Sequence, residues 1–386
     1  MGRDCRRCRG AACFTKHCLR PVLRRHGAGS CHLECRAPGL LGASVSMPPT
    51  PLPATVDSRP RTAVMLQWVG MGDLVWHVPY FRRVAETSLG GQVSLIASPT
   101  VFAGQLVGHE PWVADIIDFD RHPRRHEGRQ GRHRGVMGLF RMGIELRERQ
   151  FDRIVLFTNH TNRSLVAVTA RIPERLGYGT TWLQRRLLSH GPWIRRYAGP
   201  AVGTYEDATS FAIAQGWCDA PIAPSLLVRP EALQRAKARV QALPGTLHAL
   251  CIGSSEPYKQ WGMDNFTELA AELAGAGHGV LLVAGPAERE MAQAILQRVE
   301  PALRTRVLDA TDGTVADTVA TMSLMRTCLG NDTGGVQIAA AVGTPTWVML
   351  GPRPLLNHDP QKLHNLTAPG LADIRPGDVA RIALAA

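Results

Sequence analysis

The sequence predicts an α/β protein made of two doubly wound parallel sheets. Apolar segments of strand length alternate with helical segments from about residue 61 to residue 385, which is typical of repeated β-α-β units. Two of these strands run into Gly-containing turns, at Gly70–Asp73 and at Asn331–Gly335. The chain has 386 residues, of which 45% are hydrophobic, so it is long enough for two ordinary domains.

The first half opens with an apolar strand over Thr62–Val69, after a proline-rich lead-in. We expect a helix over Leu74–Thr87 with Pro79 in its early turns. An irregular stretch at Trp182–Pro200 looks like a lid or substrate loop. The remaining predicted strands are Gln92–Ala97, Val113–Phe119, Asp152–Thr158 and Arg175–Gly179, and the remaining helices are Thr100–Val107, Val136–Arg149, Asn162–Ala170 and Tyr205–Gln215.

The second half follows a linker, Cys218–Pro230, that contains three prolines. Its last predicted strand is Thr346–Leu350 and its last helix is Pro376–Leu384. Between these and the linker we expect helices at Glu231–Leu243, Asp264–Ala276, Gly285–Val299 and Val315–Met325, and strands at His248–Gly253, Gly279–Ala284, Arg306–Leu308 and just before Asp332.

The first candidate for chemistry is Asp73. It follows Gly70-x-Gly72 at the carboxyl end of the first strand, where open α/β sheets bind their ligands. The same position would also suit a helix N-cap, which favours aspartate for structural reasons. The glycines form only half of a dinucleotide fingerprint, so they are weak evidence for NAD.

The second candidate is the turn Asp332-Thr333-Gly334-Gly335, which leads into a short apolar helix. Glycines at such a turn let the backbone approach a ligand, and the free N–H groups of the helix can hold an anion. Asp332 would repel that anion, so it either accepts hydrogen bonds from sugar hydroxyls or caps the helix in a plain β-α-β turn.

Residues 121–134 are the most charged part of the body, with six arginines, three histidines and one glutamate. We expect a solvated loop whose arginines, among them Arg124, Arg125, Arg132 and Arg134, contact an anionic acceptor or a membrane surface. The Asp118-Phe119-Asp120 pattern before it resembles a metal-binding Asp-x-Asp. Alternation at a strand end explains it better, so we predict no metal there.

The N-terminus differs from the rest of the chain. Residues 1–46 carry nine Lys/Arg against two acidic residues, hence +7 of the total +12, and six of the nine cysteines. The spacings of these cysteines fit no regular zinc site. We interpret residues 1–60 as a disordered or wrongly assigned extension, with Met47 as an alternative start. The mildly basic remainder suits an anionic substrate or a membrane surface. We expect it to be a reduced, cytoplasmic, monomeric protein that binds no nucleic acid.

Several separated motifs occur together in one order. They are Gly70-Met71-Gly72-Asp73 with Pro79, Arg175-Leu176-Gly177-Tyr178, Gly253-Ser254-Ser255…Lys259-x-Trp261, Gly285-Pro286-Ala287-Glu288, and Asp332-Thr333-Gly334 with Gly343-Thr344-Pro345. Together they resemble glycosyltransferase family 9, the ADP-heptose:lipopolysaccharide heptosyltransferases, over roughly residues 61–385.

The resemblance implies a GT-B fold, with two Rossmann-like domains whose parallel sheets face each other across a cleft. Residues 61–225 would bind the acceptor and residues 226–386 the nucleotide sugar, with the last helix as a candidate for packing back on the first domain. Such enzymes transfer a sugar with inversion and need neither a metal nor a cofactor. The expected donor is ADP-heptose, and the expected acceptor is an anionic lipopolysaccharide-type glycan at the inner face of the inner membrane.

The resemblance also implies a role for each matching residue. Asp73 would be the general base for the acceptor hydroxyl. Ser254 and Lys259 would contact the donor phosphates, and Glu288 would bind the ribose. Asp332 would hold hydroxyls of the donor sugar, with the amides of Thr333, Gly334 and Gly335 on the diphosphate. One departure is Gln337, which stands where the family usually has histidine.

Two rival functions remain at this point. An NAD-dependent oxidoreductase would need a complete glycine fingerprint with an acidic ribose ligand about 20 residues further on, and neither turn has both. A non-catalytic anion- or nucleic-acid-binding protein would explain the charge, but the basic residues lack interleaved aromatic side chains.

Overall fold

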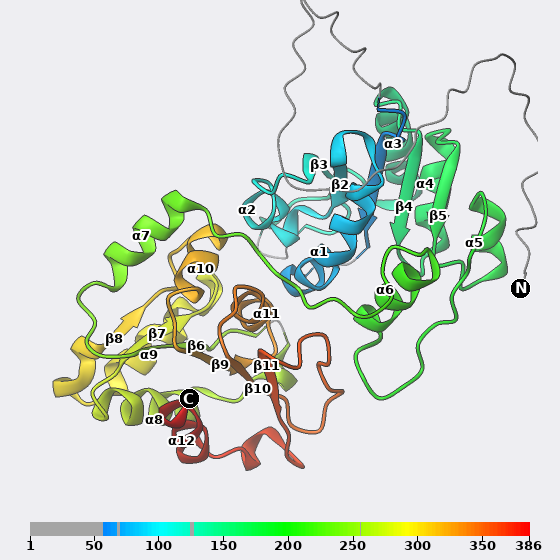
Figure 1. Ribbon diagram of the computed structural model, residues 1–386. Coiled ribbons are helices and arrows are strands. Elements are labelled where there is room, and N and C mark those ends of the chain that lie inside the picture. Colours follow the sequence, from blue (N-terminus) through cyan, green and yellow to red (C-terminus); the bar gives the residue numbers. More distant parts are fainter. Residues whose placement is uncertain (1–56, 68–69, 124–126, 255) are drawn as a thin grey trace, which may run out of the picture. The chain divides into compact units, whose positions relative to one another are not determined.

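The computed structural model describes residues 57–67, 70–123, 127–254 and 256–386, and it has the predicted α/β fold (Figure 1). The first sheet has the strand order β3-β2-β1-β4-β5, and every pairing in it is parallel. Its strands are β1 (Thr62–Leu66), β2 (Val93–Ala97), β3 (Val113–Asp118), β4 (Arg153–Phe157) and β5 (Glu174–Gly177).

The second sheet is also wholly parallel and has six strands in the order β11-β10-β9-β6-β7-β8. These are β6 (Leu247–Cys251), β7 (Gly279–Val283), β8 (Val307–Asp309), β9 (Thr327–Asn331), β10 (Thr346–Met349) and β11 (Leu363–Leu366). In each sheet the strand order reverses beside the first strand, β1 or β6. This reversal is the point where doubly wound sheets bind ligands at their carboxyl ends.

Helices separate the strands in both halves. The first half contains α1 (Met71–Glu86), α2 (Ala103–Leu106), α3 (Gly135–Glu148), α4 (Thr161–Thr169), α5 (Trp182–Leu187) and α6 (Gly203–Ala214). The second contains α7 (Pro230–Val240), α8 (Met263–Gly275), α9 (Arg289–Arg298), α10 (Val315–Met322), α11 (Gly334–Ala341) and α12 (Pro376–Ala385).

Both faces of each sheet are buried, which is why the central strands read as continuous apolar runs. Along β1, Val64 and Leu66 enter one apolar cluster, whereas Ala63 and Met65 enter another on the opposite face. The pattern repeats in the second half, where Cys251 and Leu250 face different clusters. The predicted fold class, with two Rossmann-like sheets of the GT-B type, is thus confirmed.

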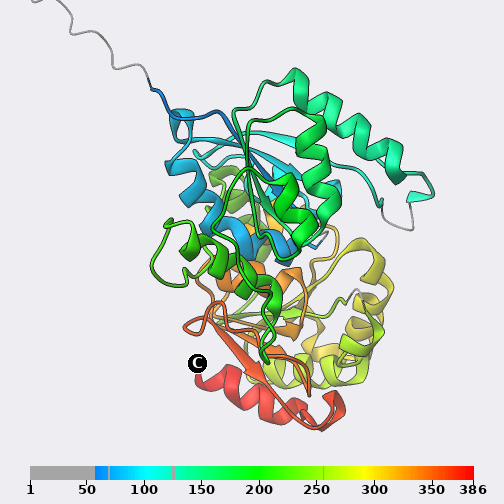
Figure 2. The same cartoon turned by 90° about the vertical axis from the view of Figure 1, so that its right-hand side faces the viewer.

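Some predicted elements differ from those observed. The irregular stretch Trp182–Pro200 contains α5, and the helix expected from Gly285 begins with a 3-10 turn before α9. The edge strand β11 was not predicted, because LHNL is short and half polar. The last helix, α12, packs on α8 and β9 of its own half, and lies beside α8 in both views (Figures 1 and 2). The expected packing of this helix on the first domain stays a prediction.

Of the proposed extension, residues 1–60, positions 1–56 lie outside the described residues. Arg124 and Arg125 also lie outside them. The described chain passes from α6 to α7 through residues 215–229, around the boundary that we expected at residue 225. The assignment of acceptor and donor to the two halves stays a prediction.

Candidate active site

Asp73 lies in the first turn of α1, at the third helical residue, and Gly70 is the N-cap. Its Oδ2 accepts a hydrogen bond of 3.1 Å from the Gly70 amide, so the carboxylate does help to cap the helix, although not as the N-cap itself. Burial raises the pKa of Asp73 to about 6, and the negative charge of Asp332 adds to this increase. The Gly70 amide and the charge of Lys259 oppose it. A carboxylate with such a pKa can accept a proton near neutral pH.

The first turns of α1 and α11 lie against each other, and two glycines permit this. A Cβ on Gly72 would stand 3.0 Å from Cγ of Gln337, and one on Gly334 would stand 3.0 Å from Cβ of Met71. The amino ends of both helices therefore come close to Asp73 and Asp332. Their positive dipole ends favour negative charge at this place.

Asp332 follows β9 and pairs with two cations. Its Oδ2 lies 3.2 Å from Nζ of Lys259 and 2.8 Å from Nη1 of Arg353. Arg353 is held in turn by the carbonyl oxygens of Leu350 and Met349. Sequence reasoning missed Arg353. Because both cations contact Oδ2, the other oxygen, Oδ1, is the one that could accept a sugar hydroxyl.

Asn331, the last residue of β9, positions the loop that carries Lys259. Its buried side chain donates to the carbonyl of Ile252 at 2.9 Å and to Oε1 of Gln260 at 2.6 Å. It also accepts from the Trp261 amide at 2.9 Å. These bonds tie the loop between β6 and α8 to the neighbouring strand, and so place Lys259 beside Asp332. Sequence reasoning missed this role, because the burial that requires the side chain of Asn331 to be hydrogen-bonded is a property of the tertiary structure.

Ser254 and Glu288 lie at the carboxyl ends of the adjacent strands β6 and β7. The Ser254 hydroxyl forms a local turn by donating to the Glu256 carbonyl at 2.8 Å. Glu288 accepts from the Gly285 amide at 3.1 Å, and its Cδ would be 3.4 Å from a Cβ on Gly253. The fold thus brings the predicted donor-binding residues of β6, β7 and β9 to one sheet edge.

Gln337 is buried in the first turns of α11 and accepts a 2.8 Å hydrogen bond from Nε1 of Trp76 on α1. The ring of Trp76 also packs on His358, 4.8 Å away between centroids. Burial lowers the pKa of His358 to about 3, so this ring is neutral at physiological pH. Gln337, which stands where the family usually has histidine, is therefore hydrogen-bonded to Trp76 of the same chain.

The basic loop is held by acidic residues of its own half. Asp120 pairs with Arg129 and accepts from the Arg132 amide, while the Arg132 guanidinium donates to Glu145 at 2.6 Å. Arg134 is the exposed N-cap of α3. Of the four arginines predicted to bind an acceptor, Arg132 therefore already has an acidic partner.

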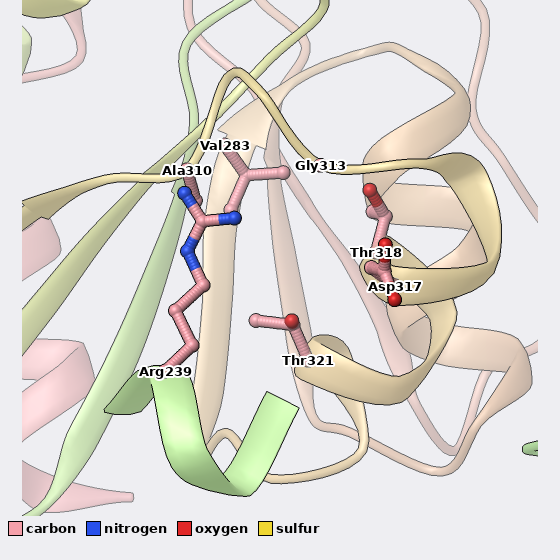
Figure 3. A pocket seen from close by; sticks show the side chains of 7 residues that line it. All are labelled: Arg239, Val283, Ala310, Gly313, Asp317, Thr318 and Thr321. Atoms are coloured by element: carbon pink, nitrogen blue, oxygen red, sulfur yellow. The ribbon is translucent and has the colours of Figure 1, made fainter. Parts of the chain in front are cut away.

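A small hollow lies in the second half, beside α7 and α10 (Figure 3). It is lined by Arg239, Val283, Ala310, Gly313, Asp317, Thr318 and Thr321. Arg239 donates to the Asp309 carbonyl and pairs with Asp312, so its charge is neutralised within the chain. This hollow contains none of the predicted site residues.

Within the described ranges, no three or more His, Cys, Asp or Glu residues gather as metal ligands would. Among the same residues, no helix is both long enough and apolar enough to span a bilayer.

Comparison with known proteins decides the family. The sequence pattern of glycosyltransferase family 9 (heptosyltransferase) matches residues 139–361, which is more than half of the chain. The chain belongs to glycosyltransferase family 9. It is therefore a glycosyltransferase, as the order of motifs predicted. The matched region includes the predicted donor-binding residues and begins after Asp73 and the basic loop.

Curated relatives of this family 9 chain share its sequence at a low level. It is 24% identical over 261 residues to lipopolysaccharide heptosyltransferase 2 of Salmonella typhimurium, a match that covers 62% of this chain and 72% of the relative. The protein of the same name from Escherichia coli is 25% identical over 257 residues, with the same coverage.

Solved structures share the fold. The ADP-heptose lipopolysaccharide heptosyltransferase II of E. coli superposes with a TM-score of 0.67 at 20% identity, covering 84% of this chain and 98% of that one. A family 9 glycosyltransferase from Veillonella parvula superposes with a TM-score of 0.70 at 17% identity, covering 86% and 97%.

Proposed function

We propose that this protein transfers a heptose from ADP-heptose to an anionic, lipopolysaccharide-type glycan, with inversion at the anomeric carbon and without a metal ion. The observation that carries the proposal is the group formed by Asp73, Lys259 and Asp332, together with Arg353. In this group Asp73, whose pKa is raised, is acted on by the charges of Lys259 and Asp332, and Arg353 pairs with the same Asp332 near two helix amino ends. The names of the relatives supply the sugar and the acceptor class.

Asp73 acts as the general base in this proposal. It takes the proton of the acceptor hydroxyl while that oxygen forms a bond to the anomeric carbon of the donor. The bond from the anomeric carbon to the phosphate oxygen breaks on the opposite side, and its electron pair leaves with the nucleoside diphosphate. A single base is sufficient, because an inverting transfer forms no covalent sugar–enzyme intermediate.

Lys259 and Arg353 stabilise the leaving diphosphate. They can offer a point charge and a planar guanidinium to its oxygens, in addition to the amides of Thr333, Gly334 and Gly335 at the start of α11. Fixed positive groups of this kind lower the energy of a transition state in which negative charge develops. Ser254 and Glu288 border the same edge, where they would contact a phosphate and the ribose.

The exposed side of α3 is suited to a membrane surface. Val136, Met137, Phe140 and Ile144 lie on one side of this helix with exposed fractions of 64%, 77%, 40% and 55%. The basic loop, which includes Arg134, precedes the helix, and Arg141 and Arg147 flank the apolar side chains. Apolar side chains bordered by arginines bind anionic bilayer surfaces, which would bring the enzyme to a lipid-linked acceptor at the inner membrane.

A transfer assay tests the proposal. The purified protein is mixed with ADP-heptose and lipopolysaccharide from a strain that lacks core heptose, in EDTA. We expect release of ADP and a heptose-labelled glycan with inverted anomeric configuration. Transfer that requires an added divalent ion, or transfer with retention, would contradict the corresponding part of the proposal. The absence of transfer from any nucleotide sugar would refute the whole.

A further inference from the structure

We propose that Arg163 and Arg121 form a preformed oxyanion site in the first half, which takes a phosphate monoester or carboxylate group of the acceptor. This inference rests on the proposed function only in identifying the bound molecule as the sugar acceptor. The site itself stands on the two guanidinium groups and their surroundings, which are separate from the donor-binding residues of the second half.

The guanidinium of Arg163 is buried and incompletely hydrogen-bonded. The residue is 9% exposed, and neither Nε nor Nη1 has a hydrogen-bond partner in the described part of the chain. Nη1 of Arg121 is likewise buried and unpaired. Buried arginines are normally paired with an acid or with carbonyl oxygens, because the desolvation of an uncompensated charge is costly.

Both guanidinium groups lie over the ring of Phe119, at 4.5 Å for Arg163 and 5.8 Å for Arg121. Two cations on one aromatic ring repel each other, and burial together with the charge of Arg121 lowers the pKa of Arg163 to about 10. His160, the N-cap of α4, lies close to the same charges. Burial and the cations Arg163, Arg196 and Arg121 lower its pKa. These cations act on one another, and an anion would relieve their repulsion.

The position of the site fits the acceptor. Arg163 is in the first turn of α4, directly after β4, and Arg121 follows β3. β4 pairs with β1, the strand that precedes Asp73. Just beyond these strands, the side chain of Gln67 accepts a 3.2 Å hydrogen bond from the backbone amide of Asn159. An anion on Arg163 is therefore at the same sheet edge as the proposed base. Lys259 and Arg353, which we assign to the donor, belong to the other sheet.

The class of ligand follows from the hydrogen-bond donors that the two arginines offer. Two guanidinium groups offer paired N–H donors that match the oxygens of a phosphate or carboxylate. Arg132 and Arg129 of the same region are less available to an anion. Arg132 pairs with Glu145, and Arg129 pairs with Asp120 and Glu127. Arg121 is the first residue of the basic loop, whereas Arg163 lies outside it in α4.

The test measures thermal stability of the full chain against inorganic phosphate, with chloride at equal ionic strength as reference and with ADP present to fill the donor site. Glucose 6-phosphate and glucose distinguish a sugar-borne phosphate from the free ion. We expect phosphate and glucose 6-phosphate, but not glucose, to raise the Tm of the wild type. In Arg163→Met the increase should disappear, while the Tm without phosphate stays the same or rises, because an unpaired buried charge is removed.

Arg132→Met is the matched control, and its response to phosphate should equal that of the wild type. Lys259→Ala should also keep the response, which separates this site from the donor site. An unchanged response in Arg163→Met would overturn the proposal. So would a marked fall in the Tm of the free variant, since it would reveal a structural partner of Arg163. Phosphate binding that depends on Arg163 without any sugar transfer would leave the site in place and refute only the proposed function.

Discussion

Nζ of Lys259 lies 3.2 Å from Oδ2 of Asp332, although 72 positions separate the two residues in the chain. Both side chains are mostly buried, with 24% and 16% exposed. The ion pair joins the loop after β6 to the turn after β9, the neighbouring strand in the sheet. It keeps a cation at the start of α11, where a diphosphate would bind.

Replacing Lys259 by alanine should weaken binding of ADP by ~1.5–3 kcal/mol, because a charge-assisted contact is lost. Titration calorimetry measures this directly. Lys237→Ala on the exposed surface of α7 is the matched control and should bind as the wild type does. Equal affinity of Lys259→Ala and the control would show that Lys259 does not contact the nucleotide.

Arg353 should contribute to ADP binding together with Lys259. Both cations bind the same oxygen of Asp332, so removing one changes the electrostatic surroundings of the other, and residues that share a partner are not energetically independent. In a double-mutant cycle of Arg353→Met and Lys259→Ala, we expect a coupling energy of ~0.5–3 kcal/mol in ADP affinity. Strict additivity would mean that the two cations act at separate places.

Asp73→Asn should slow transfer about 10²–10⁴-fold and leave donor binding intact, because it removes the base and keeps an oxygen for the Gly70 amide. Steady-state rates with the true acceptor test this. Asp264→Asn, which alters an exposed first-turn aspartate of α8, is the control. Turnover of Asp73→Asn within a few-fold of the control would mean that Asp73 only caps the helix and is not the base.

The pH dependence of the wild type should reflect the raised pKa of Asp73. As the base must be ionised, kcat/KM should fall when the pH drops through about 6. The folded pKa lies above the unfolded value of 3.8, so the folded protein binds more protons between the two values. The contribution of this group to stability therefore decreases as the pH rises from about 4 to 6. Asp73→Asn should lack that decrease, which melting curves across this range would reveal.

The exposed side of α3 should bind anionic vesicles. Changing Met137 and Ile144 to aspartate removes apolar area and adds like charge, so co-sedimentation with vesicles rich in anionic phospholipid should fall at least about tenfold. Ile213→Asp with Leu227→Asp alters two other exposed apolar side chains and should leave binding unchanged. An equal loss in both double variants would indicate an effect of net charge alone.

The sequence by itself determined the order of strands and helices, apart from α5 and β11, and the turns that carry Asp73 and Asp332. Buried parallel strands read as apolar runs, and glycines mark turns where backbones approach closely, so both signals are local. The order of motifs also determined the family, which the match over residues 139–361 confirmed. The roles of Asp73, Ser254, Lys259, Glu288 and the turn after Asp332 stay predictions.

The tertiary structure alone decided which side chains meet. Nothing local marks Arg353 as a partner of Asp332, Asn331 as the anchor of the Lys259 loop, or Trp76 as the partner of Gln337. The basic loop was the obvious candidate for binding an anion, yet Arg132 pairs with Glu145. Arg163, inconspicuous in the sequence, is buried, and its Nε and Nη1 have no hydrogen-bond partner among the described residues. Pairing and burial depend on neighbours distant in the chain, and sheet order brings these neighbours together.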